Sequence, residues 1–241
     1  MKYGFPLFCL LIGLFSCSEQ DETEPEMEPC EFYATGHFND TFPGKIPELY
    51  WPCMETKDLV DAVSYNFPSL YIQTAGCCGL QSGYDLVRSK HGFPELESRD
   101  DALEHLIAKY ISIDTIHYNC DLLSIQHGGF NFYTYNLEVV LAQEVFLKNA
   151  TKQLKLDLLD ELKIKQDLRN GESGDYACEG PTFATSRVMF FDDYQPLLDS
   201  MEHNHIIKAI VELGTINYGT DAFDAAQNNI FLLAAEYASK L

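Results

Sequence analysis

Apolar side chains recur three and four positions apart in one segment after another of the C-terminal part of this chain. This spacing gathers them on one face of an α-helix, whereas a half-buried strand needs strict alternation. The first such segment follows Ser98, where acidic residues at positions 100 and 101 suit the positive end of a helix dipole. Its apolar positions are Leu103, Leu106, Ile107 and Tyr110. The pattern predicts a helix after Ser98 that buries this face in a core.

Further helices are expected over residues 57–65, 137–148, 151–169, 186–203, 206–217 and 221–239. The last of them places six apolar residues on one stripe: Phe223, Ala226, Ile230, Leu233, Ala234 and Tyr237. A short strand is expected at 70–74. Helices with one apolar face bury that face against one another. We therefore expect a mostly α fold, in which residues 30–241 form one globular domain of packed helices with little β structure.

The N-terminus has the features of a secretory signal. Lys2 supplies a positive charge, and an apolar run of about 11 residues extends from Phe5 to Phe15. A helix that spans a bilayer needs roughly 20 such residues, so this run is too short to cross one. A charge, a short apolar region and a small residue before a break predict a signal peptide over residues 1–16.

The break itself, Leu14-Phe15-Ser16-Cys17, resembles the lipobox of bacterial lipoproteins, with leucine, then a small residue and an obligatory cysteine. The resemblance implies that the Cys17 thiol receives a diacylglyceryl group and that cleavage follows Ser16. It also implies acylation of the new amine, commonly with palmitate. Two or more acyl chains anchor a protein stably to a membrane, so the partner expected first is a lipid bilayer.

Residues 17–29 carry six acidic residues and two prolines but no basic residue. Such a segment stays extended and disordered, because its charges repel and it has little apolar surface to bury. It is expected to tether the domain. The acidic run also resembles the signal by which some Gram-negative bacteria send lipoproteins to the cell surface. That resemblance implies an outer-membrane protein facing the exterior; a spacer facing the periplasm is the alternative.

The net charge limits the choice of partners. The formal charge of the chain is −21, and it becomes about −22 once Lys2 is cleaved away with the signal. Nucleic-acid backbones and anionic lipid surfaces repel such a body, so no nucleic-acid partner is expected. A cationic partner, a divalent ion or a neutral glycan stays open.

Six cysteines follow the lipobox: Cys30, Cys53, Cys77, Cys78, Cys120 and Cys178. An even number in an exported chain is typical of disulfides, and the absence of CxxC spacing argues against zinc. Cys30 and Cys53 bracket a segment rich in aromatic residues and with three prolines, which predicts an irregular flap closed by their disulfide. Adjacent Cα atoms are about 3.8 Å apart and a bridge needs about 4.4 Å, so Cys77 and Cys78 are expected to pair with Cys120 and Cys178, in an open order.

One cluster combines imidazole and carboxylate groups, at Asp192, Asp193, His203 and His205. Histidines two positions apart on a helix point in different directions, unlike the i, i+4 pair of an HExxH zinc site. At a junction between helices they would both reach one ion, as ligands of a metal-dependent hydrolase. The alternative is a polar surface turn between two helices.

Three other sequence patterns resemble functional motifs. Residues 127–129 are similar to the oxyanion-hole segment of lipases and esterases, but the GxSxG motif of that fold is missing, and the two glycines are expected to form a turn. Aromatic clusters such as FNFYTY and ELYW suit stacking on a glycan, although aromatic residues mostly fill cores. Thr115 and Ser200 match the acceptor pattern of a bacterial O-glycosylation system.

No catalytic residue and no cofactor is assigned from these patterns. The sequence favours a membrane-anchored lipoprotein, displayed at the cell surface, that acts as a binding or scaffold module. Its ligand is unidentified, with a glycan or another surface protein as candidates. The alternative function is the metal-dependent hydrolase.

Overall fold

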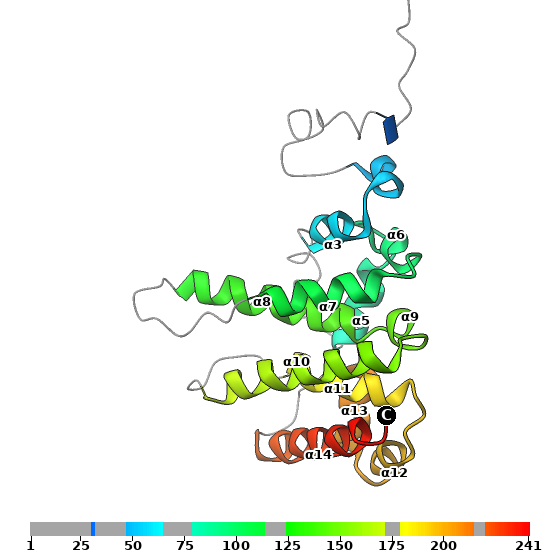
Figure 1. Ribbon diagram of the computed structural model, residues 1–241. Coiled ribbons are helices and arrows are strands. Elements are labelled where there is room, and N and C mark those ends of the chain that lie inside the picture. The colour runs from blue at the N-terminus through cyan, green and yellow to red at the C-terminus, as the bar shows by residue number, and fades with distance from the viewer. Residues whose placement is uncertain (1–29, 32–46, 65–78, 114–123, 172–178, 215–219) are drawn as a thin grey trace, which may run out of the picture.

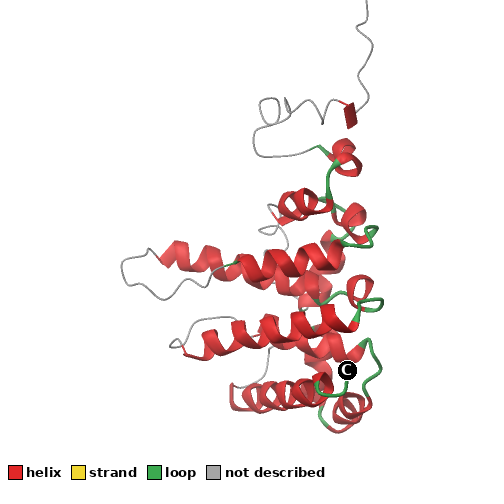
Figure 2. Ribbon diagram, viewed as in Figure 1, coloured by secondary structure: helices red, strands yellow, loops and turns green. Residues whose placement is uncertain are grey.

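The computed structural model describes residues 30–31, 47–64, 79–113, 124–171, 179–214 and 220–241. Within these ranges all regular structure is helical and no strand occurs, as Figure 2 shows. The helices pack on one another in a stack, with η1 at one end and α12 and α14 at the other (Figure 1). The predicted mostly α fold of packed helices is confirmed.

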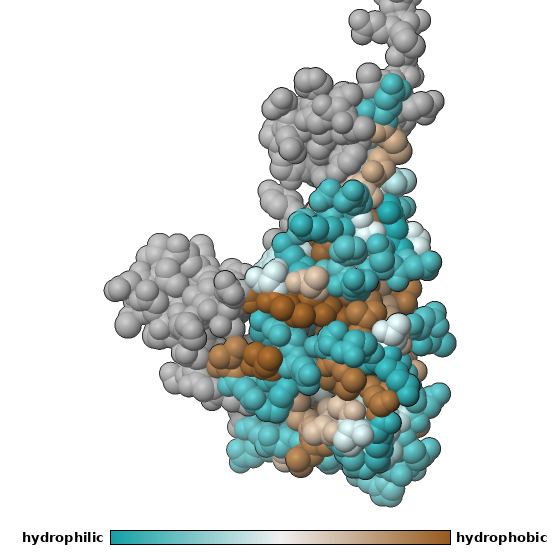
Figure 3. Space-filling model, viewed as in Figure 1, coloured by the Kyte–Doolittle hydropathy of each residue, from teal (hydrophilic) through white to brown (hydrophobic). Residues whose placement is uncertain are grey.

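The elements are, in chain order, η1 (Glu48–Cys53), α3 (Thr56–Ser64), α5 (Leu80–Val87), α6 (Phe93–Glu97), α7 (Ala102–Ser112), α8 (Ser124–Leu141), α9 (Glu144–Leu147), α10 (Lys152–Gly171), α11 (Glu179–Phe190), α12 (Gln195–His203), α13 (His205–Leu213) and α14 (Thr220–Ala238). Their buried apolar side chains form one cluster that runs from α3 to α14. On the face that Figure 3 shows, the described residues are mostly hydrophilic, with apolar side chains visible in bands.

Helix α11 is the centre of this stack. It packs against α8, α9, α10, α12, α13 and α14. Every residue from 180 to 189 is buried, including the polar residues Thr182, Thr185, Ser186 and Arg187. A helix that is buried all round needs no single apolar stripe, so its bounds are poorly marked by hydrophobic periodicity.

The helices with one buried face were predicted well. All four apolar residues expected to form the buried face of α7 are buried, from Leu103 to Tyr110. On α14 four of the six expected residues are buried, and Phe223 and Leu233 are half-buried against the same core. The expected helices at 57–65 and 151–169 correspond to α3 and α10. The helix expected at 206–217 is the shorter α13, which ends before Gly214. The strand expected at 70–74 lies outside the described residues.

Two of the expected helices begin or end elsewhere in the structure. The helix expected at 137–148 is divided, because α8 ends at Leu141 and α9 begins at Glu144. Upstream, α8 runs straight through residues 128 and 129, where a glycine turn was expected. The helix expected after Ser98 begins only at Ala102. The Ser98 hydroxyl instead donates to the Glu95 carbonyl at 2.7 Å, at the end of α6. Helices α5 and α6 were not predicted at all.

The helix expected at 186–203 is also interrupted, because α11 ends at Phe190 and α12 begins at Gln195. Asp193 adopts a φ of 51°, in the left-handed region that a continuing helix excludes. Pro196 then occupies the first turn of α12, where its missing N–H costs nothing. The apolar pattern runs across this turn, since both helices contribute to the same core.

The predicted disulfide between Cys30 and Cys53 is present. Its C-terminal cysteine ends η1, so residues 48–53 are a short 3-10 helix and not the irregular segment expected there. Residues 32–46 lie outside the described residues. Arg99 holds η1 to the body, because its guanidinium donates to the carbonyls of Trp51 and Pro52 at 3.3 Å each.

Two glycines allow α5 to approach α13 closely. Gly79 precedes α5 with a φ of 94°, and Gly214 ends α13 with a φ of 62°. A Cβ at position 79 would lie 2.3 Å from the carbonyl oxygen of Leu213, and one at position 214 would lie 2.7 Å from the Leu80 Cβ. The N-terminus of α5 therefore lies directly against the C-terminus of α13.

Replacing Gly79 with alanine tests this contact. Gly79→Ala combines a strained left-handed backbone with a collision against backbone, so we expect the free energy of unfolding to fall by about 2 kcal/mol or more. Urea denaturation followed by circular dichroism measures the change. Leu86→Ala is the control on the same helix: its side chain is 55% exposed, and we expect a change within about 0.5 kcal/mol. Equal stability of the two variants would contradict the close approach.

Candidate ligand-binding site

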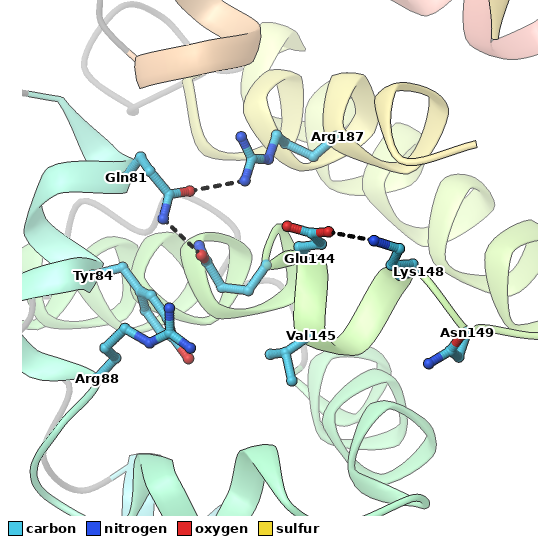
Figure 4. A pocket seen from close by; sticks show the side chains of 9 residues that line it. Gln81, Tyr84, Arg88, Glu144, Val145, Lys148, Asn149 and Arg187 are labelled. Atoms are coloured by element: carbon cyan, nitrogen blue, oxygen red, sulfur yellow. Dashed lines mark hydrogen bonds and ion pairs between the residues drawn. The ribbon is translucent and has the colours of Figure 1, made fainter. Parts of the chain in front are cut away.

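A pocket of about 340 Å³ opens beside the contact between α5 and α13. It is lined by Gln81 and Tyr84 of α5, by Arg88 at the end of that helix, by Gln143, Glu144, Val145, Lys148 and Asn149 in and around α9, and by Arg187 of α11. Three separate parts of the chain thus meet here (Figure 4). The volume lies at the lower end of the range for small-molecule sites.

The lining is cationic, although the whole chain carries a formal charge of −21. It holds three cations and one carboxylate. Arg88 pairs with Glu97 at 2.8 Å, and Lys148 pairs with Glu144 at 2.9 Å, the second pair being visible in Figure 4. No carboxylate of the described residues lies within 4 Å of the Arg187 guanidinium. Of the three lining cations, Arg187 is therefore the one that forms no ion pair with the described residues.

Arg187 is held instead by oxygens of neutral groups. Its Nε donates to the Ala142 carbonyl at 3.2 Å, and one terminal nitrogen donates to the Val211 carbonyl at 3.3 Å. The other terminal nitrogen donates to the Gln81 amide oxygen at 3.0 Å (Figure 4). Ala142 directly follows α8, and Val211 lies in the last turn of α13. Carbonyls at helix C-termini lack intrahelical partners and carry partial negative charge, so one guanidinium caps two helices.

Aromatic rings surround the same guanidinium. Its carbon lies 4.4 Å from the centroid of the Phe191 ring, with the rings of Phe183 and Phe190 at 5.5 and 5.9 Å. Only 8% of Arg187 is exposed. Burial lowers the pKa of Arg187 to about 10, while the more distant carboxylates of Glu144 and Asp85 act to raise it. The side chain stays charged at neutral pH.

Two side-chain amides in the lining of the pocket continue the hydrogen-bond network of Arg187. The Gln81 amide nitrogen donates to the Gln143 side-chain oxygen and to Asp85, at 3.0 Å in both cases. The Gln143 amide nitrogen donates in turn to the Val139 carbonyl at 2.6 Å. Because Gln81 accepts from Arg187, the direction of every hydrogen bond in this chain is set by the guanidinium.

Neither of two titratable lining groups is tuned for proton transfer. The Tyr84 hydroxyl donates to Glu97 at 2.6 Å, and burial, reinforced by that carboxylate, raises the pKa of Tyr84. The hydrogen bond from Lys148 lowers the pKa of Glu144 below its usual value. Tyr84 is thus a poor acid and Glu144 a weak base, which suits binding better than acid–base catalysis.

The structure does not gather three of the four residues predicted as metal ligands around one point. Asp192 forms an ion pair with Lys155 and accepts a hydrogen bond from the Tyr237 hydroxyl. Asp193 is exposed in the left-handed turn between α11 and α12. Within the part of the chain that the structure describes, no three histidine, cysteine or acidic residues are grouped to hold a metal ion.

The two histidines are exposed on either side of Asn204. The Asn204 side chain caps α13 by accepting from the backbone N–H groups of residues 206 and 207, at 2.9 and 3.3 Å. The His203 Nδ1 donates to the Asp199 carbonyl at 2.7 Å. His203 and His205 therefore flank a helix cap, at the junction where the sequence placed them.

The other predicted site residues are only partly described. The Ser200 hydroxyl is half-buried on α12 and donates to the Pro196 carbonyl at 2.8 Å. Trp51, Tyr133 and Tyr135 of the aromatic clusters pack against the core. The remaining positions lie outside the described residues: Cys17, Cys77, Cys78, Cys120, Cys178 and Thr115.

No protein-family model, curated protein or solved structure matches this chain. Among the helices that the structure describes, none is both long and apolar enough to span a bilayer.

Exchanging arginine for lysine at two positions of the pocket tests the role of Arg187. An ammonium group does not reach three acceptors that a planar guanidinium reaches at once, so Arg187→Lys should lower the free energy of unfolding by about 2–3 kcal/mol. The matched control is Arg88→Lys. Arg88 is half-exposed and has one ion-pair partner, so we expect a loss below about 1 kcal/mol. Equal losses in urea denaturation would show that the two helix ends do not depend on the guanidinium.

Proposed function

We propose that this protein is an exported, lipid-anchored binding module, attached to the membrane through Cys17, whose ligand site is the pocket lined by Arg187. The observation that carries the binding role is a pocket with a buried, charged guanidinium whose orientation is fixed by three hydrogen bonds. Groups held in place before a ligand arrives cost little to order on binding, which is typical of ligand sites.

A binding role suits the chemistry of the lining better than catalysis does. The nine lining residues contain no histidine, cysteine or serine to act as a nucleophile with its base. The alternative function, a metal-dependent hydrolase, gains no support from Asp192, since this carboxylate already bonds to Lys155 and Tyr237. We therefore favour the binding module over the hydrolase.

The attachment of the folded body suits a tether that ends at residue 29. The disulfide joins Cys30 to Cys53, and Arg99 joins η1 to the turn before α7. A chain leading from the lipid is thus linked covalently to one end of the helical stack in Figure 1. The pocket is lined by residues in and around α5, α9 and α11, which lie between the two ends of the stack in Figure 1.

Replacing Cys17 with alanine tests the anchor. Without the thiol there is no atom to carry the diacylglyceryl group, so Cys17→Ala protein should move from the membrane fraction to the soluble fraction after export. Fractionation and mass measurement of the N-terminal peptide give the result. Cys9→Ala, within the same apolar region, is the control and should stay lipidated. Cys17→Ala protein that still carries lipid would show that the lipobox assignment is wrong.

Surface display depends in this proposal on the acidic run that follows Cys17. Neutralising Glu19, Asp21, Glu22 and Glu24 as the corresponding amides should leave lipidation intact but hide the domain from protease added to whole cells. Neutralising Glu26 and Glu28, farther from the lipid, is the control and should leave the domain cleavable. If the first variant is cleaved as fast as the unchanged protein, the run is only a spacer.

A further inference from the structure

The contacts of Arg187 leave part of its hydrogen-bonding capacity unused. A guanidinium has five N–H bonds. Within the described residues, three of them reach oxygens, one from Nε and one from each terminal nitrogen. Each terminal nitrogen therefore keeps one N–H without an oxygen acceptor, on a side chain that lines the pocket.

We propose that the pocket binds the oxyanion group of a small molecule, a carboxylate or a phosphate, through these N–H bonds of Arg187. The inference deepens the proposed function by naming the ligand class for the same pocket. Guanidinium groups pair with the oxygens of carboxylate and phosphate more strongly than with neutral acceptors. The side-chain amide of Asn149 and the apolar side chain of Val145 also line the pocket and would contact the rest of the molecule.

The electrostatics of the site favour a negative ligand. The two helix C-termini offset part of the charge of Arg187. Burial lowers the pKa of Arg187, which means that removal from water disfavours the charged form of its guanidinium. An anion bound in the pocket would stabilise the charged form of Arg187. Arg88 and Lys148 are each paired with a carboxylate, so the charge of Arg187 is the one in the lining that an ion pair with the described residues leaves unneutralised, and it disfavours a cationic ligand. A neutral ligand would offer its remaining N–H bonds weaker acceptors than an anion does.

The size and charge of the body restrict the ligand further. A polyanion such as a nucleic acid would be repelled by a chain of formal charge −21. A molecule with one or two negative charges meets much less repulsion and fits a pocket of about 340 Å³. The oxyanion is therefore expected on a small molecule, not on a polymer.

Glu144 is the one carboxylate of the lining, and it sets the test. It lies beside Lys148 in the pocket (Figure 4), and its charge opposes an incoming anion. Removing that charge should strengthen anion binding, whereas a purely structural role of Arg187 predicts no effect. Glu236 is a matched control, because it forms the same i, i+4 pair with Lys240, is similarly exposed and does not line the pocket.

The experiment follows the Nε–H resonances of the full chain by nuclear magnetic resonance in detergent. The sequence has only four arginines, at positions 88, 99, 169 and 187, and Arg88→Lys, Arg99→Lys and Arg169→Lys assign the spectrum by elimination. Inorganic phosphate and acetate are titrated separately, with sodium chloride at the same ionic strength as the reference. We expect a saturable shift of the Arg187 resonance with at least one oxyanion, and the responding anion identifies phosphate or carboxylate as the ligand group.

Glu144→Gln should bind the responding anion roughly two- to fivefold more tightly, and Glu236→Gln should match the unchanged protein. Two results would overturn the inference: a response no different from that to chloride, or equal affinities of the two variants. The outcome is independent of the anchor. If the protein carries no lipid but the Arg187 resonance still responds to the anion, only the proposed tethering is refuted. If the protein is lipidated but the resonance does not respond, only the anion site is refuted.

Discussion

The burial of a single guanidinium sets much of the architecture around it. Arg187 lies in the central helix α11 and donates to the carbonyl that follows α8 and to one in the last turn of α13. In a continuous helix the Ala142 carbonyl would accept from the backbone N–H of residue 146, but this N–H bonds to Gln143. The interruption between α8 and α9 thus coincides with the carbonyl that the arginine uses. It is this interruption that brings Glu144 and Lys148 to the pocket.

Polar side chains along α11 and at its end make similar ties to other helices. Thr182 accepts from the Gln227 amide of α14 at 2.7 Å. Asp192, just beyond α11, is held by Lys155 of α10 and Tyr237 of α14. Breaking a buried polar pair leaves an unsatisfied group, so such ties penalise any arrangement in which helices slide or exchange places. A carboxylate that the sequence suggested as a metal ligand is, in the structure, a tie between three helices.

The sequence predicts the features whose signal is local and misses those formed by residues far apart in the chain. Helices α7, α10 and α14 have one buried face each, and their periodicity predicted them directly. Helix α11 is buried all round, and the apolar pattern continues past Asp193 into α12. The sequence therefore predicted one helix where the structure has two helices separated by a turn. The pocket was missed because its residues come from positions 81–88, 143–149 and 187, which only tertiary packing brings together. The one local signal was an arginine among the aromatic residues Phe183, Phe190 and Phe191.

The same side chain links the stability of the fold to the proposed ligand. Arg187 donates hydrogen bonds to carbonyls at the ends of α8 and α13. Gly79 and Gly214 allow α5 to lie close to α13, and Gln81 of α5 accepts a hydrogen bond from the guanidinium. An anion that binds only this folded arrangement stabilises it, by an amount that grows with the logarithm of ligand concentration above Kd. Unfolding would return the guanidinium to water and separate these groups. In the folded state the guanidinium is buried without an ion pair, which costs free energy, and a bound oxyanion would offset that cost.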